Sequence, residues 1–129
     1  MIKSRLLIFI LLVILSSCFD LANRHDTLIK QSSNKSHNKK AILFLMEGGA
    51  TISDSYQVSI VDYYEPFDST QVGNTFTVDT NHGYTGLDST SIDLTWLSYD
   101  TLLIDYDKRL RTFIKKIKVN GVSIVYEER

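Results

Sequence analysis

Apolar and polar residues alternate through most of the chain after residue 40, and this period of two restricts the fold to β structure. Successive side chains of a strand lie on opposite faces, so an alternating segment buries one face only. The alternating segments are Ser55–Tyr63, Phe76–Val78, Ile92–Trp96, Leu102–Tyr106 and Val122–Tyr126. Ala41–Met46 is apolar throughout, which is typical of a strand buried on both faces. We therefore expect a mainly β fold, an antiparallel sheet of six or seven strands rolled into a small sandwich or open barrel.

The segment from Lys108 to Val119 fits two kinds of structure. Four of its apolar residues have the spacing of an amphipathic helix: Leu110, Phe113, Ile114 and Ile117. The dipeptide Asn120-Gly121 that follows is the strongest short hairpin signal, and it favours a strand on each side. A hairpin would place Lys115 on the inner face, where its ammonium group must reach out of apolar surroundings. We favour the hairpin, with one short helix near residues 108–118 as the alternative.

The first 18 residues have the layout of an export signal. Two basic residues precede the apolar run Leu6–Leu15, which is shorter than the roughly 20 residues that a membrane-spanning helix needs. The run ends in Leu15-Ser16-Ser17-Cys18, which resembles the lipobox of bacterial lipoproteins. The resemblance implies cleavage after residue 17 and lipidation of Cys18. Cys18 is the only cysteine of the chain, and lipidation would account for an unpaired thiol in an exported protein.

A lipidated cysteine predicts a protein that is anchored in the bacterial cell envelope. Phe19 occupies the position where enteric lipoproteins carry an aspartate as an inner-membrane retention signal, so the outer membrane is favoured for a Gram-negative host. Residues 18–40 are polar and low in complexity, which predicts a flexible tether with a reach of about 25 Å. A single β-rich domain then covers residues 41–129.

Charge is segregated along this domain. Ala41–Asp107 contains eleven acidic residues and no lysine or arginine, whereas Lys108–Lys118 contains six basic residues and no acidic one. An acidic, exported domain is a poor nucleic-acid binder. We expect the basic segment to meet an acidic protein surface, anionic lipid headgroups or the domain's own acidic sheet. The basic candidates for partner binding are Arg109, Arg111, Lys115 and Lys116.

Tyrosines outside the alternating segments, or at their ends, are further candidates for a partner-binding rim. Tyrosine is favoured at recognition surfaces because it combines a large apolar ring with a polar tip. The candidates are Tyr63, Tyr64, Tyr84 and Tyr99.

The stretch Asp79-x-Asn81-x-Gly83 resembles the start of an EF-hand calcium loop. The match then fails, because glycine stands at the fifth position and Thr90 stands where a bidentate glutamate is needed. The metal prediction is therefore none, with weak calcium candidates at Asp79, Asn81, Asp88 and Asp100.

The sequence contains no recognisable catalytic set. There is no Gly-x-Ser-x-Gly motif, and His82 is the only histidine after residue 40, within the turn-like stretch Asn81-His82-Gly83. We expect no cofactor and no enzymatic activity. The leading interpretation is a non-enzymatic binding module for an envelope protein partner. An immunity-type lipoprotein is a specific form of this interpretation. The alternatives are a small-ligand or calcium-binding envelope protein, or an envelope enzyme that uses His82.

The expected domain also resembles a group of small, uncharacterised exported bacterial proteins. The shared features are Gly49-Ala50-Thr51, Gln57-Val58-Ser59-Ile60, a strand that bears Trp96, and a terminal segment that ends in Val125-Tyr126. The resemblance implies one compact domain and assigns no catalytic residue.

Overall fold

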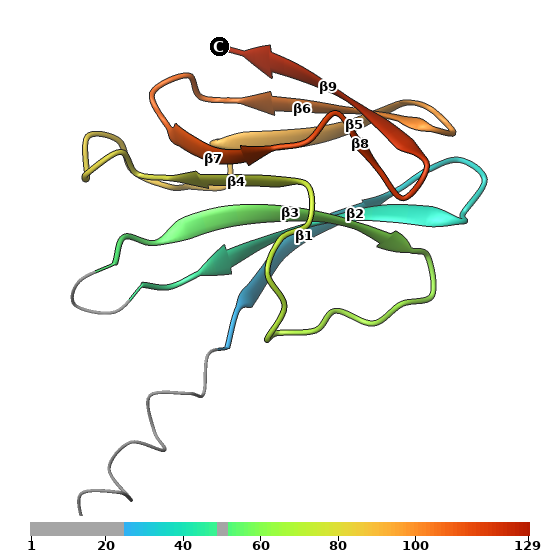
Figure 1. Ribbon diagram of the computed structural model, residues 1–129, viewed down its shortest axis with the longest axis horizontal. Helices are drawn as coiled ribbons and strands as arrows, with labels where there is room; N and C mark the ends of the chain where they lie inside the picture. Colours follow the sequence, from blue (N-terminus) through green and yellow to red (C-terminus); the bar gives the residue numbers. More distant parts are fainter. Residues whose placement is uncertain (1–24, 49–51) are drawn as a thin grey trace, which may run out of the picture.

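The computed structural model describes residues 25–48 and 52–129, which form nine strands in two sheets and no helix (Figure 1). The strands are β1 (Thr27–Ser33), β2 (Lys39–Met46), β3 (Ser55–Asp62), β4 (Phe76–Asp79), β5 (Ile92–Ser98), β6 (Thr101–Tyr106), β7 (Arg111–Lys115), β8 (Lys118–Val119) and β9 (Val122–Glu128). The first sheet has the order β1-β2-β3-β4-β7 and the second the order β5-β6-β9-β8. The predicted β sandwich is confirmed. Within the described part of the chain, no helix is long and apolar enough to cross a membrane.

One core lies between the two sheets. Alternate residues of both sheets point into it, as the period of two predicts. At one side of this core the ring of Phe76 packs against Tyr106 and Tyr126, with ring centres 4.9 and 5.3 Å away. Complete burial of a side chain of this size contributes about 2–3 kcal/mol to the free energy of unfolding.

The first strand corrects the predicted domain boundary. Thr27–Ser33 form β1 and β2 begins at Lys39, so the prediction of a flexible tether was wrong for residues 27–40, and the domain starts before residue 41. β1 is a polar edge strand whose side chains are half-buried or exposed, and it therefore shows no apolar period. The indole Nε1 of Trp96 donates a hydrogen bond to the Ser32 carbonyl (2.9 Å), and this bond ties β1 to β5. Residues 18–24 lie outside the described residues.

Strand β3 is buried on both faces, where the alternation predicted a half-buried strand. The segment 63–75 covers part of its outer face. Phe67 packs on the outward-facing ring of Phe44 (5.6 Å between ring centres), and the Gly73 N–H donates to Gln57 Oε1 (2.6 Å). Polar side chains on that face therefore form hydrogen bonds with the backbone of a covering loop. The alternation in the sequence does not show whether such side chains bond to a loop or to water.

Residues 108–119 contain two short strands, so the hairpin prediction is confirmed and the helix alternative is wrong. The hairpin joins β8 to β9 at Asn120 and Gly121, whose positive φ angles of 50° and 79° suit a tight turn. β7, however, pairs with β4 in the other sheet, so the chain crosses from one sheet to the other after Lys115. This crossing makes β9 parallel to β6, and the second sheet is mixed where an antiparallel sheet was expected.

Lys115 lies at one side of the core, where its ammonium group contacts tyrosine rings and a hydroxyl group. Its Nζ lies 4.9 and 5.5 Å from the ring centres of Tyr126 and Tyr106, and it donates to the Tyr106 hydroxyl (3.2 Å). The ring faces attract the cation, which offsets part of its lost hydration. Lys115 is exposed as a residue, and its ammonium group reaches over the tyrosine rings at the rim of the core instead of being buried among apolar side chains.

Candidate functional site

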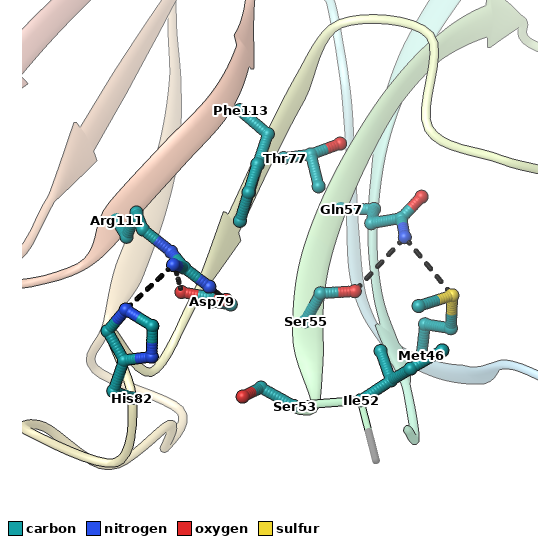
Figure 2. Close-up of a pocket in the computed structure, with 10 residues that line it drawn as sticks. All are labelled: Met46, Ile52, Ser53, Ser55, Gln57, Thr77, Asp79, His82, Arg111 and Phe113. Atoms are coloured by element: carbon teal, nitrogen blue, oxygen red, sulfur yellow. Dashed lines mark hydrogen bonds and ion pairs between the residues drawn. The ribbon is translucent and has the colours of Figure 1, made fainter. Parts of the chain in front are cut away.

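A hollow of about 410 Å³ lies on the outer face of the five-stranded sheet, beside the part that segment 63–75 covers (Figure 2). Ligand-binding pockets have volumes of roughly 300–1,000 Å³. Its floor comes from two cross-strand pairs of β3 and β4, Ser55 with Asp79 and Gln57 with Thr77. The full lining consists of Met46, Ile52, Ser53, Ser55, Gln57, Thr77, Asp79, His82, Arg111 and Phe113.

A charged pair joins β4 to β7 in this hollow. Asp79 and Arg111 are direct cross-strand neighbours. Arg111 Nε donates to Asp79 Oδ1 (3.2 Å) and Nη2 donates to Oδ2 (2.5 Å), a bidentate geometry. Burial of Asp79 would raise the pKa of its carboxyl, but the hydrogen bonds from Arg111 and the Asn81 N–H, with the charge of Arg111, outweigh that effect and lower the pKa. Asp79 is therefore an anion at neutral pH.

His82 completes the surroundings of the Arg111 guanidinium. The residues Asn81, His82 and Gly83 all have positive φ and form a turn, which the Asn81 N–H fixes by donating to Asp79 Oδ1 (2.8 Å). This turn brings His82 Nε2 to 2.9 Å from Arg111 Nη1. Arginine only donates, so His82 Nε2 is the acceptor in this contact. The ring of Phe113 lies against the same guanidinium, 4.8 Å from Cζ to the ring centre.

Hydrogen-bonding capacity remains at the hollow after these contacts. The Thr77 hydroxyl oxygen is buried and has no hydrogen-bond partner among the described residues. Arg111 has five N–H groups, of which three are used by Asp79 and His82. Gln57 Nε2 donates to Ser55 Oγ (3.1 Å), which leaves the Ser55 hydroxyl hydrogen available. Exposed apolar surface stands beside these groups at Ile52 and Phe113.

The alternation of polar and apolar residues predicted that Ser55 and Gln57 face solvent, and it indicated no functional role for Thr77. Polar residues at alternate positions beside a strongly apolar strand, Ala41–Met46, were the available signal. That signal does not tell a binding face from a solvated face.

A second, more polar hollow of about 300 Å³ brings together three sequence candidates, Tyr84, Asp88 and Arg109. Arg109 Nη2 donates to Asp107 Oδ2 (2.6 Å). The side-chain and backbone hydrogen bonds of Arg109 lower the pKa of Asp107 to about 2. Hydrogen bonds from the Thr90 side chain and backbone likewise lower the pKa of Asp88. The carboxylates here are already occupied by neighbours on the same loops.

The end of β3 that precedes Tyr63 and Tyr64 and the β5–β6 turn that contains Tyr99 lie at the opposite end of the sandwich from the end of β4 at Asp79 (Figure 1). The ring of Tyr63 packs edge-on against Tyr64, 4.9 Å between centres, and Tyr64 and Tyr99 are 90% and 66% exposed. Asn34 joins the turns at this end, and the sequence did not single it out. Its Nδ2 donates to Asn38 Oδ1 (2.6 Å) and to the Tyr99 carbonyl (2.7 Å).

The structure does not bring the four calcium candidates together. Asp79 binds Arg111, Asp88 binds Thr90, and Asp100 lies at the tyrosine-bearing end, where it accepts from Ser98 Oγ (2.9 Å). Across residues 25–48 and 52–129 there is no group of three or more His, Cys, Asp or Glu side chains that could hold a metal ion.

The basic candidates have different surroundings. Arg109 and Arg111 are in ion pairs, and Lys115 lies on tyrosine rings. Lys116 is exposed. Part of the basic segment thus compensates the domain's own acidic residues.

No protein-family model matches this chain, and neither the curated proteins nor the solved structures include a significant match to it.

Proposed function

We propose that this protein is a lipid-anchored protein of the bacterial cell envelope whose β sandwich is a non-enzymatic binding module, with its ligand in the Asp79–Arg111 hollow. The observation that carries the proposal is the hollow itself. It combines an ion pair whose carboxylate is buried, a buried hydroxyl without a partner among the described residues at Thr77, and exposed apolar side chains. A concave, partly apolar site with a few fixed polar groups is the usual form of a small-ligand site.

The chemistry of the lining indicates the class of ligand. Asp79 and Arg111 cancel each other's charge, and His82 accepts a hydrogen bond from Arg111. A ligand with a net charge would therefore gain little from the site. The ligand that fits is small and uncharged, with oxygen or nitrogen acceptors for Arg111 and Thr77 and an apolar face for Phe113.

The same geometry supports a binding role over catalysis. A general base must have a free acceptor within reach of the substrate proton. The acceptor nitrogen of His82 faces a guanidinium N–H at 2.9 Å, and a proton can be taken up there only when that contact breaks. A His82→Ala variant that kept its fold but lost a chemical activity of the protein would favour the enzyme alternative instead.

The test is an NMR titration of the full, isotope-labelled chain in neutral detergent. The compounds are small and uncharged: monosaccharides, nucleosides and N-acetyl amino acid amides. We expect at least one class to shift resonances of the hollow residues, and Thr77→Val to weaken that binding about fivefold because one hydrogen bond is lost. Tyr64→Ala, at the opposite end, is the matched control and should leave the affinity unchanged. Shifts confined to the tyrosine-bearing end, or none at the hollow with any class, would contradict the proposal.

A further inference from the structure

The two edges of the five-stranded sheet differ. At one edge, β1 is held against β5 by the Trp96–Ser32 hydrogen bond and by the ion pair of Lys30 with Asp93 (2.9 Å). At the other edge, β7 pairs with β4 and has no strand on its far side among the described residues. Every residue of β7 is half-buried or exposed. One row of backbone N–H and C=O groups in β7 is therefore open to a further strand.

The open edge has its own charge and apolar character. Lys116 follows β7 directly and Lys118 begins β8. Both are exposed and form no ion pair with any residue that the structure describes. Phe113 and Ile117 stand beside them and are 58% and 77% exposed. After residue 40 the sequence contains thirteen acidic and seven basic residues, and six of the basic ones lie in 108–118. This edge is thus a cationic strip with two apolar side chains on an otherwise acidic domain.

We infer that β7 is a docking edge for an extended, acidic segment of a partner protein, which adds to the five-stranded sheet as a further strand. Strand addition supplies affinity through backbone hydrogen bonds, while alternate side chains give specificity. Acidic residues of the segment would meet Lys116 and Lys118, and its apolar residues would contact Phe113 and Ile117. This complementarity of charge also speeds the encounter of the two proteins.

A second copy of this chain is a poor occupant of the same edge. Antiparallel pairing of two β7 strands would bring the cations of one copy close to those of the other. In an antiparallel pair centred on Phe113, Arg111 of each copy would lie opposite Lys115 of the other, so two cations would meet at each end of the pair. Like charges on paired strands are destabilising, and lysine on an edge strand works against self-association. An acidic partner removes this repulsion.

The inference goes beyond the ligand in the hollow. An added strand would lie beside β7 in the plane of the sheet, whereas the hollow lies on the outer face. Thr77, on β4, serves the hollow and has β7 between itself and the open edge. The two proposals can therefore fail separately: Thr77→Val tests the hollow, and the experiment below tests the edge.

The probe is a six-residue peptide of alternating valine and glutamate, titrated into the full chain in neutral detergent. We expect slowed hydrogen exchange of β7 amides and resonance shifts confined to residues 111–118. The matched control is the same peptide with every backbone nitrogen methylated, which keeps all side chains but removes the N–H donors of both edges. A peptide in which lysine replaces glutamate is the charge control. Neither control should bind.

Two protein variants complete the test. Lys116→Glu combined with Lys118→Glu should weaken peptide binding at least about tenfold. Lys35→Glu combined with Lys40→Glu makes the same change in net charge near the β1–β2 turn and should leave binding unchanged.

Equal binding of the methylated peptide, or an unchanged affinity in the Lys116/Lys118 variant, overturns the inference. Concentration-dependent shifts at β7 without peptide would instead identify a second copy. Lysine-dependent shifts with phosphatidylglycerol nanodiscs alone, and none with the peptide, would identify a lipid surface.

Discussion

Arg111 on β7 binds Asp79 on β4 through two hydrogen bonds at the floor of the outer hollow. Asp79 is only 4% exposed, so its carboxylate depends on this guanidinium and on the Asn81 N–H for the interactions that water would otherwise supply. The pair joins the edge strand to the rest of its sheet and sets the charge of the hollow to zero. One contact thus links the stability of β7 to the binding properties of the site.

Replacing Arg111 with leucine should be costly to stability. The change leaves a buried carboxylate without its charged partner, and we expect the free energy of unfolding to fall by about 2–4 kcal/mol. Arg109→Leu is the matched control, because Arg109 forms a similar pair with Asp107 but is itself largely exposed. Its loss should cost clearly less than the loss of Arg111, because solvent screens an exposed pair. Urea denaturation of both variants measures the difference, and equal losses would show that the burial of Asp79 has no energetic weight.

The same carboxyl predicts how stability depends on pH. The pKa of Asp79 is lowered in the folded protein from its ordinary value of 3.8. The Asp79 carboxylate therefore makes its full contribution to the free energy of unfolding above that value. This contribution is lost as the pH falls from about 4 through the pKa of the folded protein. Asp79→Asn lacks this contribution at every pH. Urea unfolding at pH 2 to 6 should show a difference between wild type and variant that is largest above about pH 5 and shrinks towards pH 2. A difference that stays constant over this range would contradict the assignment.

Gly73 allows segment 63–75 to lie close against β3. A Cβ at this position would stand 2.8 Å from Gln57 Cβ and 3.2 Å from the Val58 carbonyl oxygen, so Gly73→Ala forces the loop away and weakens its bond to Gln57. We expect a loss of about 1–3 kcal/mol in unfolding free energy. A Cβ on Gly86 would meet nothing within 4 Å, so Gly86→Ala should be neutral or stabilising by less than about 1 kcal/mol. Thermal unfolding of the two variants compares them directly, and similar behaviour would refute the close approach at Gly73.

The fold was predictable wherever burial follows the alternation of the strand. The alternating segment Leu102–Tyr106 lies within the observed strand β6 for this reason, and the continuous apolar run Ala41–Met46 lies within β2. The pattern failed where polar residues form hydrogen bonds with another segment of the chain instead of with water. β1 is a polar edge strand held by its ladder with β2, and β3 has a polar outer face that a loop covers. Neither situation leaves an apolar period in the sequence.

The candidate site was only partly predictable. Asp79, His82 and Arg111 each stood out, but as a calcium ligand, a catalytic histidine and a partner-binding cation. They meet because the chain crosses between the sheets and pairs β7 with β4, which brings together residues 32 positions apart. Strand pairing at that distance depends on the whole topology, and no local spacing encodes it.

Asn34 is expected to hold the tyrosine-bearing end together. It is 1% exposed, and Asn34→Asp would replace two hydrogen-bond donors with a carboxylate oxygen facing Asn38 Oδ1 and the Tyr99 carbonyl. We expect a loss of about 2–3 kcal/mol. Asn120→Asp makes the same chemical change in an exposed turn, where one bond to the Ile60 carbonyl (2.8 Å) is lost, and should cost less than about 1 kcal/mol. Urea unfolding of the two variants measures the difference, and equal losses in Asn34→Asp and Asn120→Asp would rule out this role.

The lipid anchor can be tested separately from the domain, because Cys18 precedes the first described strand. Labelled palmitate should enter the wild-type protein and not a Cys18→Ser variant, since serine lacks the thiol that accepts the diacylglyceryl group. The wild type should also partition into detergent and the variant into the aqueous phase, because several acyl chains give nearly permanent membrane attachment. The Asp79–Arg111 pair lies far along the chain from Cys18, so the urea unfolding of the folded domain should be the same in both. Palmitate labelling that persists in Cys18→Ser would exclude this cysteine as the anchor and leave the binding module to be explained without one.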